Sequence, residues 1–175
     1  GGALRNVSGT NTWQGNLTLG LGSRINSDAD LLTLSGTVTS TNLGLTVGGA
    51  GNTSISGTIA LGTGALTKDG AGRLTLSAAN TYTGLTTISG GTLAYGVANA
   101  ISTGGITLSG GGTLDLATFS DTVGAVTLTS GTILGTGTLT STSNFTTSNG
   151  VISAVISGTG SNVGIVQGTG TTVLS

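Results

Sequence analysis

The sequence lacks cysteine, proline, methionine and histidine, and its 175 residues include only four basic and five acidic side chains. Without cysteine there is no disulfide framework, thiolate nucleophile or zinc–thiolate site. Without histidine there is no histidine-assisted serine nucleophile. The basic residues are too few to form the positive stripe that phosphate binding requires, so we expect no nucleic-acid partner.

Long apolar runs are also missing, and none approaches the ~18 residues of a transmembrane helix. We therefore expect no membrane span in this segment. No signal peptide begins the sequence, and there is no methionine, so we expect a piece excised or processed from a longer repeat array. Disorder is disfavoured because 35% of the residues are hydrophobic and only 5% are charged, whereas disordered chains combine low hydrophobicity with high charge.

Short apolar–polar–apolar triplets recur along the chain. Typical examples are residues 32–34, 74–76 and 126–128, each with threonine in the middle. Alternation with period two is the pattern of a β-strand, and β-branched threonine suits a pleated surface. Glycine, serine, asparagine and aspartate, which favour turns, separate the triplets. Many short strands at close spacing predict an all-β sandwich, barrel or solenoid.

Internal repetition favours the solenoid. The segment Asn11-Thr-Trp13 recurs 69 residues later as Asn80-Thr-Tyr82, and related sequence lies near residues 1–20, 55–95 and 150–175. A solenoid also explains why the strands carry almost no charge, because each strand is paired with the rungs on both sides. We predict one continuous parallel β-helix over residues 1–175, with roughly seven to nine rungs at ~20–25 residues each.

The stretch from Leu66 to Leu93 resembles the autotransporter-associated β-strand repeat, also called the passenger-associated transport repeat. The motifs that carry the resemblance are Gly70-Ala-Gly72, Asn80-Thr-Tyr82-Thr-Gly84 and Gly90-Gly91-Thr-Leu93. This resemblance implies a right-handed parallel β-helix in the exported passenger of a bacterial surface protein, secreted or displayed at the cell surface. Residues 96–150 lack a clear motif and leave room for an additional function.

Two aromatic residues of the repeated segment are candidates for glycan contact, because an aromatic face can stack on a sugar. These are Trp13 and Tyr82. The simpler interpretation is a structural corner, in which asparagine tolerates a left-handed backbone and glycine turns the chain. The structural turn residues on this interpretation are Asn11, Gly15, Asn80 and Gly84.

The local charge cluster Lys68, Asp69 and Arg73 could serve a β-helical polysaccharide lyase, which needs a basic residue beside acids. A surface ion pair in a turn is the simpler interpretation, and exposed pairs of this kind contribute only ~0–1 kcal/mol. We therefore predict no catalytic residue and no enzyme activity.

Two features suggest calcium but fall short of a site. Asp28 and Asp30 supply only two carboxylates, and hard cations require more oxygen ligands. Residues 48–55 are similar to a calcium-binding glycine-rich repeat, but they occur once and carry Asn52 where the pattern has aspartate. We expect a turn followed by a strand there, and no metal or cofactor.

The leading prediction is an extracellular structural segment, either an adhesin stalk or a filament subunit that stacks end to end with other copies or adjacent repeats. A carbohydrate-binding adhesive module that contacts surface glycans is the alternative. An ice-binding protein is a further alternative, because Thr-x-Thr pairs occur at residues 37–39, 127–129 and 138–140. An ice face needs threonine at one fixed position on every rung, and the varying intervals between these pairs disfavour it.

Overall fold

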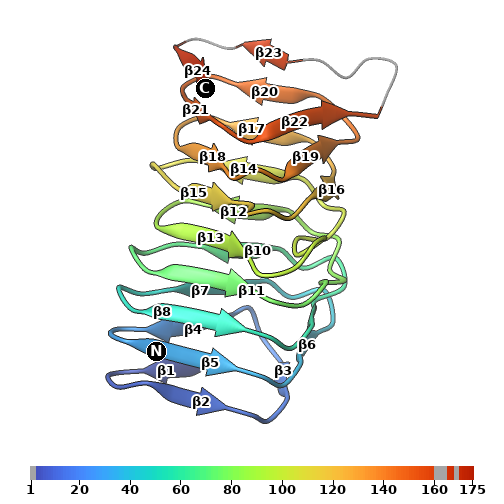
Figure 1. Cartoon of the computed structure of the whole chain (residues 1–175). Helices are drawn as coiled ribbons and strands as arrows, with labels where there is room; N and C mark the ends of the chain where they lie inside the picture. The colour runs from blue at the N-terminus through green and yellow to red at the C-terminus, as the bar shows by residue number, and fades with distance from the viewer. Residues whose placement is uncertain (1–2, 160–164, 168–169) are drawn as a thin grey trace.

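The computed structural model describes residues 3–159, 165–167 and 170–175. All strand pairs in this part of the chain are parallel, and each joins a strand to its equivalent one rung later (Figure 1). A rung here means one complete turn of the chain. The molecule is a parallel β-helix of about eight turns, which confirms the predicted fold and the predicted number of rungs.

Two long sheets run the length of the molecule. We call them face A and face B. Face A contains β1 (Leu4–Asn6), β4 (Ser23–Ser27), β7 (Leu45–Gly48), β10 (Leu66–Lys68), β12 (Thr86–Ile88), β14 (Ile106–Leu108), β17 (Val126–Leu128), β20 (Phe145–Thr147) and β23 (Ile165–Gln167). Face B contains β2 (Asn11–Trp13), β5 (Leu31–Leu34), β8 (Asn52–Ile55), β11 (Arg73–Leu76), β13 (Thr92–Tyr95), β15 (Thr113–Asp115), β18 (Thr132–Leu134), β21 (Gly150–Ile152) and β24 (Thr172–Leu174).

The third face consists of two short sheets with a gap between them. One sheet contains β3 (Leu17–Leu19), β6 (Val38–Ser40) and β9 (Ile59–Ala60). The other contains β16 (Asp121–Val123), β19 (Thr138–Ser141) and β22 (Val155–Gly158). Two rungs between β9 and β16 therefore cross this face without a strand.

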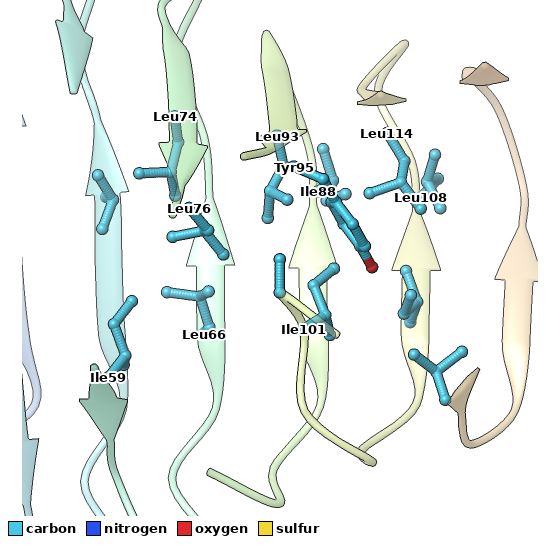
Figure 2. Packing of buried hydrophobic residues seen from close by; sticks show 14 of the residues in the cluster. Ile59, Leu66, Leu74, Leu76, Ile88, Leu93, Tyr95, Ile101, Leu108 and Leu114 are labelled. Carbon is cyan, nitrogen blue, oxygen red and sulfur yellow. The ribbon is translucent and has the colours of Figure 1, made fainter. Parts of the chain in front are cut away.

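The apolar triplets fill the interior, as their alternation predicts. Leu74 and Leu76 on β11 are fully buried, whereas Thr75 between them is partly exposed. Successive residues of a strand point to opposite sides, so the two leucines face inward together. Leu93 and Leu114 continue the column of Leu74 on the next two rungs (Figure 2). Each such buried side chain contributes roughly 1.5–3 kcal/mol to stability.

The sequence repeat and the structural repeat have different lengths. Asn11 lies on β2 of face B, whereas Asn80 lies on the third face, where its side chain reaches Ile59 of β9. Partners on faces A and B are 19 to 22 residues apart, as in Thr127↔Thr146 and Ser23↔Leu45. Sixty-nine residues are therefore between three and four rungs, so the two copies of the motif occupy different positions.

Candidate functional site at the gap in the third face

Asn80 replaces a strand where the third face is interrupted. Its Oδ1 accepts a hydrogen bond from the backbone N–H of Ile59 at 2.7 Å, and its Nδ2 donates to the carbonyl of Ala100 at 2.6 Å. These two partners lie on the preceding and following rungs. The buried side-chain amide thus carries the ladder across a rung that has no strand of its own.

Asp121 closes the other end of the gap. Its Oδ2 accepts hydrogen bonds from the backbone N–H of Ile101 at 3.0 Å and from the Tyr95 hydroxyl at 2.7 Å, and its Oδ1 accepts from the N–H of Thr122. Burial raises the pKa of Asp121 above its usual value, while these three hydrogen bonds act in the opposite direction. The carboxylate joins β13 and the strandless rung to β16.

Tyr82 fills the interior beneath the gap. It is 0% exposed, and its hydroxyl lies 2.8 Å from the Thr86 hydroxyl. Burial raises the pKa of Tyr82 far above its usual value. We considered Tyr82 as a glycan contact, which requires an exposed ring face, and the structure corrects that expectation because the ring packs in the core. Alternation within a strand could not predict the burial of Tyr82, because this residue lies outside the strands.

A cavity of about 370 Å³ opens at the gap. Its polar wall includes Asn80, Thr81, Asn99, Ser102 and Asp121. The polar atoms of Asn80 and the carboxylate oxygens of Asp121 are already bonded within the protein. These groups therefore hold the rungs together, and the arrangement offers no activated nucleophile or proton shuttle.

We expect Asn80→Ala to reduce the free energy of unfolding by about 2–4 kcal/mol, because it leaves the buried N–H of Ile59 and the carbonyl of Ala100 without partners. Asn80→Asp should give an intermediate loss, because it keeps the acceptor for Ile59 but loses the donor to Ala100. Urea denaturation followed by circular dichroism measures the effect. The exposed Asn149→Ala is the matched control, and equal losses at positions 80 and 149 would contradict the bridging role.

The first copy of the motif has a different environment. Trp13 remains 43% exposed on β2 and borders a cavity of about 230 Å³ together with Leu4 and Leu32. The Nδ2 of Asn11 donates to the Asn6 side chain at 2.6 Å. Of the two aromatic residues considered for glycan contact, Trp13 alone keeps an accessible ring.

Gly15 and Gly84 lie in turns where successive rungs approach closely. A Cβ atom at Gly84 would come within 2.3 Å of the carbonyl oxygen of Gly64 on the preceding rung. A Cβ atom at Gly36, one rung after Gly15, would come within 2.2 Å of the Gly15 carbonyl oxygen. Contact between stacked backbones thus explains glycine at positions 36 and 84, whereas a Cβ atom at Gly15 would meet only the Trp13 ring, at 3.3 Å.

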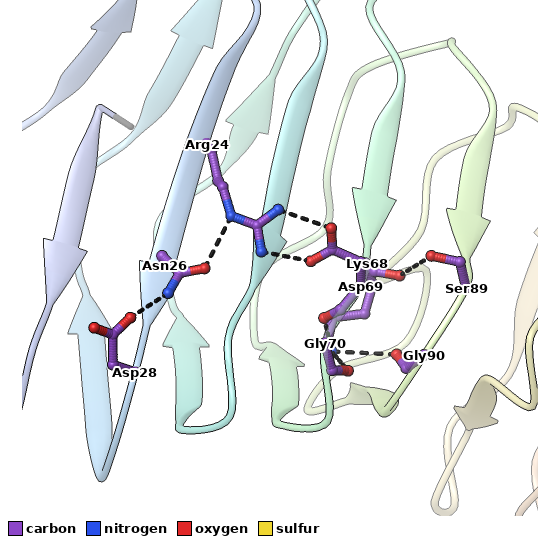
Figure 3. A network of polar contacts seen from close by, with 8 residues as sticks. All are labelled: Arg24, Asn26, Asp28, Lys68, Asp69, Gly70, Ser89 and Gly90. Atoms are coloured by element: carbon purple, nitrogen blue, oxygen red, sulfur yellow. Dashed lines mark hydrogen bonds and ion pairs between the residues drawn. The ribbon is translucent and has the colours of Figure 1, made fainter. Parts of the chain in front are cut away.

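Lys68 is buried, contrary to the expected surface ion pair. It is 1% exposed at an inward position of face A between Val47 and Ile88. Its Nζ donates to the carbonyl oxygens of Asp69 at 2.6 Å, Gly70 at 3.1 Å and Gly90 at 3.2 Å (Figure 3). Burial lowers the pKa of Lys68 to about 8, Asp69 opposes that shift, and Arg24 adds to it.

The carboxylates near Lys68 pair with arginines on other rungs. Arg24 reaches two rungs along face A to form a bidentate pair with Asp69, with distances of 2.7 and 2.8 Å (Figure 3). Arg73 also reaches two rungs, along face B, and pairs with Asp115 through a single contact of 2.8 Å. The cluster Lys68, Asp69 and Arg73 is therefore not one site, because its three members have separate partners.

The lysine predicts a pH dependence of stability. Between pH about 8 and 10.5 the unfolded chain keeps the Lys68 proton while the folded chain has lost it, so the free energy of unfolding rises with pH in this window. Lys68→Met lacks this dependence. Across this window, the free energy of unfolding of the wild type should rise relative to that of Lys68→Met by at most a few kcal/mol, because one unit of pKa shift corresponds to about 1.4 kcal/mol.

Urea denaturation at a series of pH values from about 7 to about 11 measures this difference. The Lys68→Met chain is also the control for every other group that titrates in the same range. Curves for the two proteins that stay parallel over the whole range would contradict the lowered pKa.

The calcium candidates also have other partners. Asp28 pairs with Arg5 at 2.8 Å and also accepts a hydrogen bond from Asn26, and Asp30 accepts from the N–H of Gly9 at 2.7 Å. Within residues 3–159, 165–167 and 170–175, no group of three or more metal-ligating side chains comes together. Residues 49–51 form the turn after β7 and residues 52–55 form strand β8, as expected.

Comparison with known proteins agrees with the resemblance in the sequence. The family model of the passenger-associated-transport-repeat matches residues 66–94. Searches of curated proteins and of solved structures gave no significant match. Over its described ranges, the chain contains no helix long and apolar enough to cross a bilayer.

The matched residues cover β10, β11, the Asn80 corner, β12 and most of β13, a little more than one rung. The repeat therefore includes the strandless corner, with Asn80 as the bridge and Tyr82 as the filler. Such repeats are typical of the β-helices of autotransporter passengers, which are bacterial surface or secreted proteins, and are usually non-catalytic. Residues 66–94 of this chain thus match the passenger-associated transport repeat.

Proposed function

We propose that the chain is an extracellular structural segment of a bacterial surface protein, serving as the stalk of an adhesin or as a stacking filament subunit. The observation that carries the proposal is the continuity of faces A and B over nine strands each. At the inter-strand spacing of about 4.8 Å, nine strands make a rod about 40 Å long. Such a rod transmits position and force along its axis through an unbroken ladder.

The use of charge supports the same proposal. Arg5, Arg24 and Arg73 each pair with an aspartate on another rung. Lys68 binds turn carbonyls. The basic side chains thus connect rungs, which is what a spacer requires.

The stalk and the filament differ in what lies against β2. Among the described strands, β2 pairs only with β5. The carbonyl of Trp13 accepts the N–H of Ser35, so by alternation the N–H of Thr12 points to the other side. A further rung can add there, supplied by a preceding repeat in a stalk or by another copy in a filament.

Negative-stain electron microscopy of the 175-residue chain tests the proposal. A stalk segment appears as short rods of constant length, and a filament subunit appears as rods that lengthen with concentration. Thr12→Pro removes the free N–H at the edge and should abolish lengthening without breaking the pair with β5. A compact particle at every concentration would contradict both forms of the proposal.

A carbohydrate-binding module is the second candidate, and the exposed ring of Trp13 favours it. Binding on a glycan array that is lost in Trp13→Ala and retained in Tyr82→Phe would support this function. No binding by the wild type, or equal binding by the two variants, would exclude Trp13 as a sugar platform.

A further inference from the structure

Six threonines form a file along the outside of face A. The file occupies the middle position of six consecutive strands, from β7 to β20, and each member is the direct register partner of the next. Its members are Thr46, Thr67, Thr87, Thr107, Thr127 and Thr146. All six are partly exposed between two buried neighbours.

The file is regular in space although its spacing in sequence is not. Successive members are 19 to 21 residues apart, as in Thr127↔Thr146 and Thr46↔Thr67. The turns absorb these differences, and the hydrogen-bonded ladder holds the side chains at about 4.8 Å. Six threonines therefore span about 24 Å in one line. The varying intervals in sequence, which disfavoured an ice-binding face, are therefore compatible with one fixed threonine position on each of these rungs.

The two rows of residues beside the file have mostly short, uncharged side chains. On one side the stacked residues are Gly44, Ala65, Leu85, Gly105, Ala125 and Asn144. On the other side they are Asp69, Ser89, Ser109, Thr129 and Ser148. The charged groups Arg24 and Asp69 are paired with each other near one end. From Thr87 to Thr146 these three rows contain no charged residue.

The hydroxyls of the file have no hydrogen-bond partner among the described residues. Other threonines do have partners: the hydroxyls of Thr18 and Thr39 lie 3.4 Å apart, and Thr129 Oγ1 donates to the backbone carbonyl of Leu108 at 2.9 Å. The file therefore presents six free donor–acceptor groups, each beside a methyl group, at one repeat distance.

We propose that face A is an ice-binding surface whose contact residues are this file of threonines. This goes beyond the structural role proposed above. Water next to the file can bond to each hydroxyl while it orders around the intervening methyl groups, so the sheet imposes its own period on the first water layer. One such contact is weak, but six at fixed spacing act together on a lattice and cannot detach independently.

Ice fits this surface better than two other occupants. A polysaccharide surface is commonly held by aromatic platforms, and face A carries none in the file or its flanking rows. The file and its two flanking rows measure about 24 Å by about 13 Å. A second copy laid on them would bury only about 300 Å² on each side, far below the ~800 Å² per partner of a standard interface. The outward column of face B is shorter and mixed. Its hydroxyl residues are Thr12, Thr33, Ser54 and Thr75, after which it continues as Ala94, Asp115 and Leu134.

Thermal hysteresis and the shape of single ice crystals, measured on the 175-residue chain, test the proposal. The wild type should produce a freezing gap and faceted crystals. Thr107→Lys places a charged, hydrated side chain in the middle of the file and should reduce the gap at least about tenfold, because contacts on either side lose their shared plane. Thr107→Ser should retain most of the gap.

The matched control is Thr75→Lys, the same change at an outward position of face B. Circular dichroism verifies that each variant keeps its β-structure. The proposal fails if the wild type shows no hysteresis, or if Thr75→Lys and Thr107→Lys lose it equally. Two results without hysteresis in the wild type would assign the face to another occupant and overturn the proposal. One is sedimentation as a dimer that Thr107→Lys abolishes. The other is retention on insoluble cellulose that Thr107→Lys abolishes.

Discussion

Replacing Gly57 by alanine is expected to destabilise the β-helix by about 3 kcal/mol, because the added methyl group has no space between rungs. A Cβ atom at Gly57 would lie 2.0 Å from the carbonyl oxygen of Gly36 on the preceding rung. That contact is with backbone, so no side chain can rotate away from it. Relief requires the two turns to separate, which strains the ladders on both sides of them.

Gly20→Ala is the matched control, because a Cβ atom there meets nothing within 4 Å. Its effect on the free energy of unfolding should stay within about 0.5 kcal/mol. Chemical denaturation of the two variants beside the wild type measures the contrast. If alanine were equally tolerated at positions 20 and 57, the close stacking of the turns would not limit stability.

Truncation of Leu93 is the second large effect. Leu93→Ala should cost about 2–5 kcal/mol, which combines the lost transfer free energy with the cavity that remains. Leu93 lies between Leu74 and Leu114 in one column, and all three side chains are fully buried (Figure 2). The ladders of faces A and B fix the rung spacing, so the column cannot collapse into the space.

The control for this truncation is Leu21→Ala, since Leu21 is 76% exposed. It should change the free energy of unfolding by no more than about 0.5 kcal/mol. Because solenoid rungs interact mainly with their neighbours, Leu93→Ala can also make the urea transition broader or biphasic. A loss at Leu93 no larger than that at Leu21 would show that the apolar column is not what stabilises the rod.

The inward and outward faces of the strands were predictable from local pattern. The alternation Leu74-Thr75-Leu76 places two leucines on one side whatever the rest of the chain does, and the structure buries both. The same rule contained the signal for Lys68. It is in phase with Leu66 on β10, so alternation places it inside. Its charge suggested the surface, whereas the turn carbonyls at its tip make burial possible.

The gap in the third face was beyond local pattern. The first copy of the Asn-Thr-aromatic motif lies on a strand with Trp13 exposed, and the second lies at a strandless corner with Tyr82 buried. The difference depends on the rungs above and below. Only beside Ile59 and Ala100 does the Asn80 side chain have partners to bridge.

The sequence by itself determined the class of fold, the resemblance of residues 66–94 to the passenger-associated transport repeat and the identity of most inward side chains. These properties follow from period-two alternation and from short turn motifs, which act within a few residues. The tertiary structure alone decided which residues stack. Register between rungs is set by hydrogen-bonded ladders about 20 residues apart, so the file of threonines on face A and the bridge at Asn80 exist only once the chain is wound.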